Sequence, residues 1–432
     1  MNFNFRLFLI TIFILTVGYK TFGYSFYWLG IPLGPVVITE GLVAFVILSW
    51  FAINRVKFVN WGNRLLMPFL LLIIFTIIQA FRNIFFDQMS INSVLDRLPL
   101  FLTLFFVFPL VYQFTTINQI EKFVKIVIAM GITASFIMLL QFLFPYELMT
   151  RIRVYEGFIR VRTTANILVV FNLLLSFSYL LLSKSRGGKK KKYSFLFVLS
   201  ASTLMLTLSR GLILGSIISM IIIILIYNVD IKKSIISFRS IVIAILSLIV
   251  VLTVSFFTEI SFETYISKIN EGITEFTAYE SQGSIGIRKE MIAVKFITNF
   301  NENPILGRGL NFEEYEGLKE GSKEYYTLFY FNPYALTGDT TWPNIMLVYG
   351  IIGIIIFLII LFNLFKEARS IISNKNSIFV NSILFSTMSI PGFIAIHSFA
   401  ASYLSSHNLI LIVILSVSLF HLKKKLDVKD NL

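Results

Sequence analysis

Seven arginines stand out for where they fall relative to the long apolar segments of this chain: Arg151, Arg153, Arg160, Arg162, Arg210, Arg288 and Arg308. A guanidinium group is planar and permanently charged, and its fork of N–H donors matches the oxygens of a diphosphate. A neighbouring carboxylate or a lipid headgroup is the competing explanation for each of them. Arg210 is the hardest to explain in that way, because residues 195–227 are otherwise uncharged. We expect Arg210 and Arg288 to have a functional role, since an ionisable group among membrane-spanning segments is a candidate functional residue.

Asp339 is the second candidate for chemistry, and it comes just before an apolar segment that begins near Thr341. At the start of a helix, an aspartate can cap the free backbone N–H groups. The same carboxylate above a membrane surface can act as a general base that deprotonates an acceptor hydroxyl. The sequence leaves both roles open. Trp342 is similarly ambiguous, because its ring can stack on a sugar or belong to the aromatic belt of a membrane protein.

Metal and cofactor chemistry has little support in the sequence. The chain has three histidines and no cysteine, so disulfide and thiol chemistry are not available to it. No group of His, Asp and Glu has the spacing of metal ligands, and no glycine-rich phosphate-binding loop is present. We therefore expect a reaction that requires neither a metal ion nor a cofactor.

The elements that must position these residues are apolar helices. The chain has 432 residues, of which 56% are hydrophobic and 14% charged. Apolar runs of about 18 residues recur along it, and that length crosses the hydrocarbon core of a bilayer. A helix is the form that satisfies its own backbone hydrogen bonds in lipid. The sequence predicts an all-α, polytopic integral membrane protein.

About twelve transmembrane helices are expected. One apolar stretch, 195–227, would form a helix about 50 Å long, too long for a bilayer without severe tilt. We divide it at Arg210, which then lies at the membrane surface rather than inside. The expected segments are 7–24, 36–53, 65–81, 98–115, 123–144, 164–183, 194–209, 211–228, 240–258, 341–365, 378–398 and 402–421.

The basic residues define the orientation of these segments. The net charge is +14, and most lysines fall in every second gap between segments, which is the pattern of cytoplasmic loops. Both termini are then cytoplasmic, and the chain divides into helices 1–9 (1–258), a large extracytoplasmic loop with short helices (259–340), and helices 10–12 with a basic tail (341–432). This distribution fits membrane lipids as partners and excludes nucleic acid as the reason for the charge.

The large loop contains a pattern of its own. Apolar residues recur between Arg288 and Thr298 at a helical period, which predicts a helix lying against the membrane domain. A turn is expected next, through Asn303-Pro304 and Gly307-Arg308-Gly309.

Three stretches in fixed order resemble the O-antigen ligase and polysaccharide polymerase superfamily. They are Leu206 to Gly211, Gly286 to Arg288 followed by Asn303 to Phe312, and Asp339 to Trp342 leading to Leu347 to Gly353. Each is short, but their order, their spacing and the twelve expected spans agree over most of the chain. One position differs: ligases usually carry His-Asn where this chain has Asp339-Thr340, and polymerase members can carry Asp there.

The resemblance implies glycosyl transfer outside the cytoplasm of a bacterium, in its inner membrane. The implied donor is a glycan on undecaprenyl diphosphate, and the acceptor is a glycan or a lipid-linked glycan. Arg210 and Arg288 would neutralise the diphosphate, and Asp339 would act as the base. The substrate would also be bound by Arg160, Arg162, Arg308 and Trp342.

On this basis we expect a polymerase that joins repeat units of an O-antigen, a capsule or an exopolysaccharide, with a chain-length regulator as a further partner. The first alternative is a ligase that moves finished glycan onto lipid A core or protein. A transporter of lipid-linked sugars would have inverted repeats and charges near the midplane, and the sequence has neither. A purely structural membrane scaffold does not account for Arg210.

Overall fold

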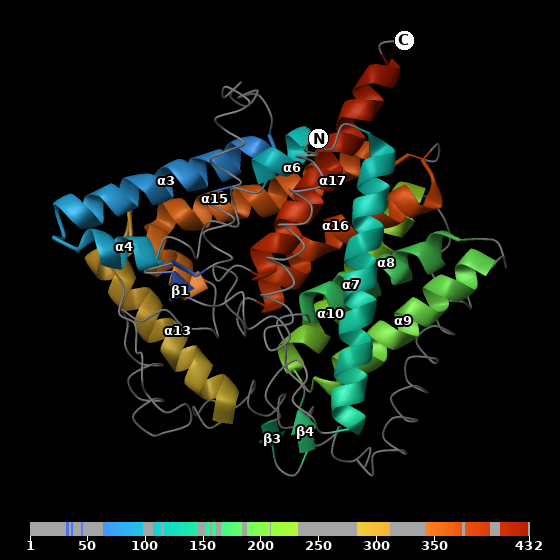
Figure 1. The fold of residues 1–432 in the computed structure, drawn as a ribbon, viewed down its shortest axis with the longest axis horizontal. Coiled ribbons are helices and arrows are strands. Elements are labelled where there is room, and N and C mark those ends of the chain that lie inside the picture. Colours follow the sequence, from blue (N-terminus) through green and yellow to red (C-terminus); the bar gives the residue numbers. More distant parts are fainter. Residues whose placement is uncertain are drawn as a thin grey trace.

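The computed structural model is a helical assembly (Figure 1). The structure describes residues 32–33, 36–37, 45, 64–97, 107–113, 116–144, 153–155, 158–160, 166–183, 188–207, 209–231, 283–311, 342–373, 376–397 and 407–430.

The described helices are α3 (Leu66–Phe85), α4 (Ile91–Arg97), α6 (Val107–Gln113), α7 (Ile117–Leu143), α8 (Asn166–Leu182), α9 (Gly188–Leu206), α10 (Arg210–Ile231), α13 (Gly283–Glu302), α15 (Trp342–Ile371), α16 (Ile378–His397) and α17 (His407–Asp430). Two antiparallel hairpins accompany them. They are β1 (Pro32–Leu33) with β2 (Val36–Val37), and β3 (Arg153–Tyr155) with β4 (Phe158–Arg160).

Four described helices are long and apolar enough to cross a membrane: α3, α7, α15 and the first 18 residues of α16. This agrees with a helical membrane protein, while the full number of twelve spans and the large loop stay predictions. Segments 7–24 and 240–258 lie outside the described residues, and only parts of 36–53 and 98–115 fall within them. At one position the prediction is wrong, because Val36–Val37 form a strand where a helix was expected to begin.

The break predicted at Arg210 is present, because α9 ends at Leu206 and α10 begins at Arg210. The main neighbours of the two helices differ: α9 packs chiefly on α8 and α7, whereas α10 packs chiefly on α16, and both contact α8. Small residues let α10 and α16 approach closely. A β-carbon on Gly215 would lie 3.0 Å from the ring of Phe393, and Ser219 donates a hydrogen bond of 3.2 Å to the carbonyl of Ser389. Such contacts are typical of helix packing in membranes.

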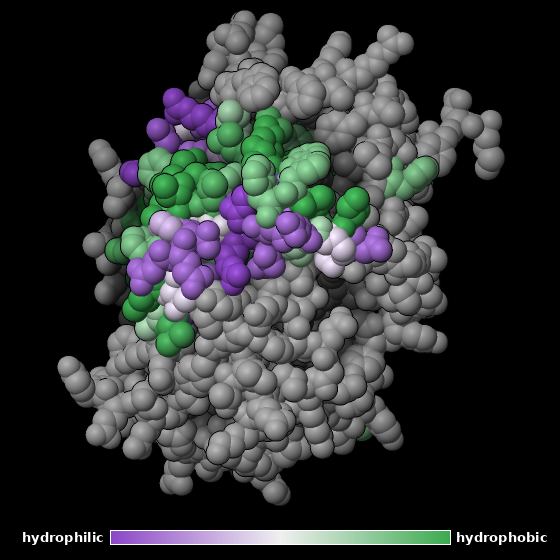
Figure 2. Space-filling view, turned by 90° about the vertical axis from the view of Figure 1, so that its left-hand side faces the viewer, coloured by the Kyte–Doolittle hydropathy of each residue, from purple (hydrophilic) through white to green (hydrophobic). Residues whose placement is uncertain are grey.

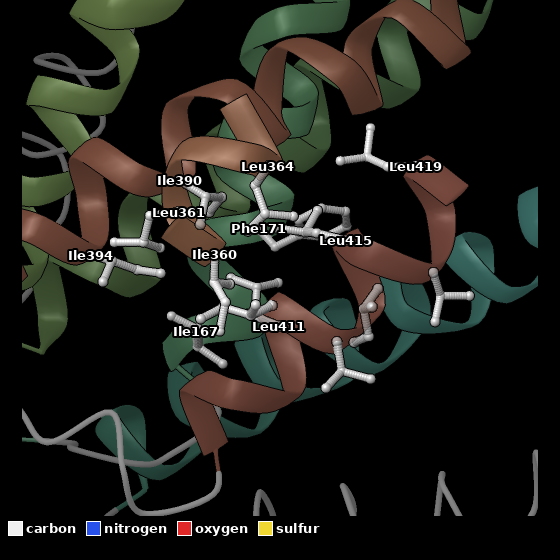
Figure 3. Close-up of a cluster of buried hydrophobic side chains, with 14 of the residues drawn as sticks. Ile167, Phe171, Ile360, Leu361, Leu364, Ile390, Ile394, Leu411, Leu415 and Leu419 are labelled. Carbon is white, nitrogen blue, oxygen red and sulfur yellow. The ribbon is translucent and has the colours of Figure 1, made fainter. Parts of the chain in front are cut away.

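The apolar core forms where α8, α15, α16 and α17 meet, as Figure 3 shows. Phe171 of α8 lies among Leu364 of α15 and Leu415 of α17, and all three are fully buried. Nearby, Lys423 of α17 lies 2.6 Å from the carboxylate of Glu367 at the end of α15. The sequence assigned both residues to cytoplasmic gaps, and this ion pair agrees with their lying on the same side of the protein.

The apolar and polar side chains of helix α3 are distributed as expected for a helix in contact with lipid. Its outward positions are apolar and exposed, among them Ile74, Ile78 and Phe81, while its inward positions include polar side chains at Gln79 and Asn83. Figure 2 views this side of the molecule and shows apolar surface beside a hydrophilic patch. In lipid, apolar groups face outward at no cost, and polar groups are better placed where protein partners can bond to them.

Candidate functional site

Helix α15 is broken at Gly350, which changes the single continuous span predicted over 341–365. Gly350 has φ 60° and ψ −156°, a backbone conformation almost confined to glycine. The two arms fold back on each other, since the ring centroids of Trp342 and Phe357 are 5.7 Å apart. Fifteen residues of straight helix would span about 22 Å. The arm before the break is too short to cross a bilayer, whereas residues 351–371 extend for about 30 Å.

The turn after α13 packs into this break. The N–H groups of Arg308 and Gly309 donate to the carbonyls of Leu347 and Val348, at 2.6 and 3.0 Å. In return, the N–H of Ile351 donates to the carbonyl of Pro304 at 2.8 Å. Backbone groups that the helix break leaves open are therefore satisfied by the turn. The predicted turn is confirmed, and its attachment to α15 is an addition to that prediction.

Two glycines of the turn allow this close approach. Gly307 and Gly309 have φ of 65° and 68°, in the left-handed region that other residues rarely adopt. A β-carbon on Gly307 would lie 2.6 Å from the backbone nitrogen of Gly350, and one on Gly309 would overlap the amide oxygen of Asn83. The two glycines thus allow the backbone of the turn to lie directly against α15 and the side chain of Asn83.

Helix α3 supplies the third side of this contact. Asn83 accepts a hydrogen bond of 2.6 Å from the N–H of Leu310 and donates one of 2.9 Å to the carbonyl of Arg308. Gln79 donates to the carbonyl of Leu306. We call residues 303–311, together with Gln79, Asn83 and the break in α15, the clasp. It fixes the C-terminal end of α13 against the membrane-spanning helices.

Arg308 and Trp342, both predicted to bind substrate, lie at the clasp and at the start of α15. The backbone of Arg308 is part of the clasp on both its N–H and its carbonyl side, and its side chain is half-buried. Trp342 is also half-buried and packs edge-on against Phe357. A packing role is therefore visible for both residues, and substrate binding stays a prediction.

Arg288 lies in the second turn of α13, which confirms the helix predicted in the large loop. This helix packs against α15. Along its axis, Arg288 precedes the end of α13 by about 20 Å, so the structure does not bring it together with Arg308. Seven and eleven residues after Arg288 come Lys295 and Asn299, which are 1% and 0% exposed. Because these spacings return to one face of a helix, the three residues occupy the same face.

Arg210 is the first residue of α10, after a turn that holds the helix end. The hydroxyl of Thr207 accepts a hydrogen bond of 3.2 Å from the N–H of Ser209, and the carbonyl of Ser209 accepts one of 3.0 Å from Ile213. No acidic residue lies in the first turn of α10. The start of a helix has free N–H groups and a partial positive charge. This end of α10 is therefore electropositive.

The hairpin of β3 and β4 contributes further arginine positions. Its register pairs Arg153 directly with Arg160, so both residues lie on one face of the hairpin. Arg162 and Asp339 lie outside the described residues.

Three of these features lie on one side of the molecule in Figure 1. They are the β3–β4 hairpin, the end of α13 that carries Arg288, and the junction where α9 ends and α10 begins at Arg210, all in the lower part of the view. The basic end of α17, with Lys423 and Lys424, lies in the upper part. Arginine positions and this lysine-rich end are thus on different sides of the protein.

Sequence reasoning did not identify Gln79, Asn83 or Lys295. The two amides were visible as polar residues in an apolar segment, spaced by four, which marks one face of a helix. Lys295 is buried although it lies in a segment that was expected to be a loop. Its signal was the spacing of seven from Arg288, which places two cations on one helix face.

The comparison with protein families supports the resemblance drawn from the motifs. Residues 195–358 match the family model described as O-antigen ligase. The matched segment includes the Arg210 turn, α13, the turn after it and the break in α15. This segment of the chain is therefore similar to the O-antigen ligase family. A comparison with curated proteins gives no match.

Proposed function

We propose that this protein is a glycan polymerase of the inner membrane, which joins repeat units carried on undecaprenyl diphosphate at the outer face. The observation that carries the proposal is the family match, because one matched segment includes the helices that carry Arg210 and Arg288, the turn 303–311 and the break in α15. The choice of polymerase rests on Asp339-Thr340, which stands where ligases usually carry His-Asn.

The proposed reaction is a direct displacement. The acceptor hydroxyl oxygen bonds to the anomeric carbon of the donor while the bond from that carbon to the diphosphate oxygen breaks. The leaving lipid diphosphate takes the electron pair, and the hydroxyl proton passes to Asp339. Displacement of this kind inverts the anomeric centre. The donor is already activated, so the reaction requires neither a nucleotide nor a metal ion.

The arginines would act on the leaving group. Negative charge on the diphosphate increases as its bond to the sugar breaks, and fixed cations stabilise that charge without reorganising. Arg210 at the electropositive start of α10 is well suited to this role, and Arg288 would act from α13. Arg160 and Arg162 would bind the glycan or assist with the anionic group; in the hairpin register, Arg160 is paired with Arg153.

The clasp would give the site its rigidity. The turn that follows α13 and the first arm of α15 meet in the clasp. The helix that carries Arg288 and the segment that follows Asp339 are therefore fixed to the same backbone contact. Preorganised donors stabilise a transition state more effectively than mobile ones.

A ligase is the second candidate, because the match to the O-antigen ligase family does not distinguish the two functions. The two functions differ in acceptor: a polymerase extends a lipid-linked glycan, whereas a ligase transfers finished glycan to lipid A core or protein. Both use the same donor chemistry, so the arginines would have the same role.

The two candidates are separated by glycan chain length in a deletion strain complemented with variants. Loss of a polymerase leaves single repeat units on the final acceptor, whereas loss of a ligase leaves long chains on undecaprenyl diphosphate. We expect Arg210→Ala, Arg288→Ala and Asp339→Ala to give the first pattern, with Arg64→Ala, on another element, as control. If Asp339→Ala keeps full activity, the base has been misassigned.

A further inference from the structure

An exposed row of apolar side chains runs along the second half of α13 and into the turn that follows it. On the helix the row consists of Ala293, Ile297 and Phe300, whose spacing places them on one face. In the turn it continues with Ile305 and Leu306. We call these five residues the apolar edge. Ile297 is 58% exposed and Ile305 is 62% exposed, whereas the opposite face of the helix is buried.

The apolar edge is the reverse of what a helix surrounded by water presents, because such a helix turns its polar side chains outward. Single exposed apolar residues are common in soluble proteins, but a continuous apolar surface indicates contact with something other than water. From Ala293 to Leu306 the charged residues are Lys295, which is buried, and Glu302 at the helix end. The edge itself therefore carries no charge.

The apolar edge adjoins the exposed faces of two helices that are long and apolar enough to cross a membrane, α3 and α15. Gln79 of α3 donates a hydrogen bond to the carbonyl of Leu306, and the outward face of α3 is apolar and exposed. On the other side, the N–H of Ile352 donates to the carbonyl of Ile305 at 3.4 Å, about one turn before the exposed Ile355 of α15. One apolar surface thus extends from the spans onto the loop helix.

We propose that the apolar edge is inserted among the phospholipid acyl chains of the leaflet on the side of the large loop. Acyl chains are the occupant because the edge continues the outward faces of α3 and α15, which contact the same chains in a bilayer. Helix α13 then lies in the membrane interface with one face in lipid, and the clasp fixes its end to the spans. This inference does not depend on which reaction the protein catalyses.

The test uses fluorescence quenching at single positions. The chain has no cysteine, so Ile297→Cys or Ile305→Cys gives one site for a bimane label in the full-length protein. The labelled protein is reconstituted into vesicles of phosphatidylethanolamine and phosphatidylglycerol. One quencher is phospholipid with brominated acyl chains, and the other is iodide in the water. Ile78→Cys, on the outward face of α3, is the lipid-facing control, and Lys424→Cys is the water-facing control.

We expect brominated acyl chains to quench the labels at positions 297 and 305 as much as the label at position 78. Iodide should quench both severalfold less than it quenches the label at position 424. The labelled variants should melt close to the unmodified protein, and Phe300→Cys replaces either one that does not.

Two results would overturn the proposal. Strong quenching by iodide at either position of the apolar edge would show that the edge lies in water. If neither iodide nor brominated lipid quenches the labels, the edge is covered by a second copy of the chain, by a protein partner or by a retained carrier lipid, and not by the bilayer.

Discussion

The clasp and the interface between α10 and α16 both contain buried polar groups. One bond crosses that interface, from Ser219 to the carbonyl of Ser389, but most hydroxyls of α16 bond within their own helix. In the clasp, Asn83 bonds to backbone atoms of residues 308 and 310, far along the chain. In α16, Ser386 and Thr387 donate to carbonyls one turn earlier in their own helix, at 2.7 and 2.8 Å. Bonds of the first kind specify which segments meet, whereas bonds of the second kind only remove the cost of a buried hydroxyl.

This difference indicates how the protein separates two tasks. The α10–α16 interface sets the spacing of membrane-spanning helices through small residues. The clasp sets the position of a loop helix relative to those spans through amides and left-handed glycines. The proposed site depends on the second task, because α13 carries Arg288.

The largest effect is expected for Gly350→Ala, compared with Gly215→Ala in the other region. At Gly350 the new side chain would adopt a disfavoured conformation and overlap the carbonyl of Ile305, at a cost of about 3 kcal/mol or more. At Gly215 the new methyl group meets the edge of Phe393, and the gain in helix propensity of about 1 kcal/mol offsets the strain. Thermal unfolding in detergent measures both, and equal melting temperatures would remove the distinction.

A smaller effect is expected when Asn83→Leu is compared with Ser386→Ala. Loss of the Asn83 amide leaves the N–H of Leu310 and the carbonyl of Arg308 without this partner, at a cost of roughly 1–3 kcal/mol. Loss of the Ser386 hydroxyl removes a bond within its own helix and a long contact of 3.4 Å to the hydroxyl of Ser178, and should cost less than about 1 kcal/mol. Glycan synthesis should fall with Asn83→Leu and persist with Ser386→Ala. If Ser386→Ala proved less stable than Asn83→Leu, the hydroxyl bonds would contribute more to stability than the amide contacts of the clasp, contrary to this account.

The third comparison, with a smaller effect than Asn83→Leu, is Lys423→Met. This variant tests whether an ion pair between helices stabilises the fold as much as the clasp does. Glu367 is 5% exposed and its partner Lys423 is 44% exposed, so water screens the pair on one side. We expect a loss of about 1 kcal/mol, with the exposed Lys424→Met as control. A melting temperature as low as that of Asn83→Leu would show that charge pairing matters as much as the amide contacts.

The sequence predicted those parts of the fold that depend on local signals. The break at Arg210, the helix that carries Arg288 and the turn at Gly307 and Gly309 follow from charge, periodicity and glycine spacing. The reversal of α15 at Gly350 was not predicted. A continuous apolar segment predicts a single span, and its composition does not show whether the helix folds back. Its signal lies in a long-range contact, which a single sequence does not display.

For the candidate site, the arginine roles stay predictions from the sequence, and the contacts that support the arginine-bearing elements were not predicted. The role of Asn83 depends on backbone atoms more than two hundred residues later, so no local pattern could assign it. Lys295 needed its burial to be noticed. Asp339 and Arg162 lie outside the described residues, and their roles stay predictions.

The most direct measurement of the central claim is the reaction itself, with purified protein and a repeat unit linked to undecaprenyl diphosphate. Released lipid diphosphate and the length of the glycan product are followed together. The account predicts that the unmodified protein lengthens the glycan and releases one lipid diphosphate per unit added. It also predicts that Arg210→Ala and Arg288→Ala each lower the rate by about a hundredfold or more, the loss typical for one electrostatic group. Unchanged rates in both variants would contradict it.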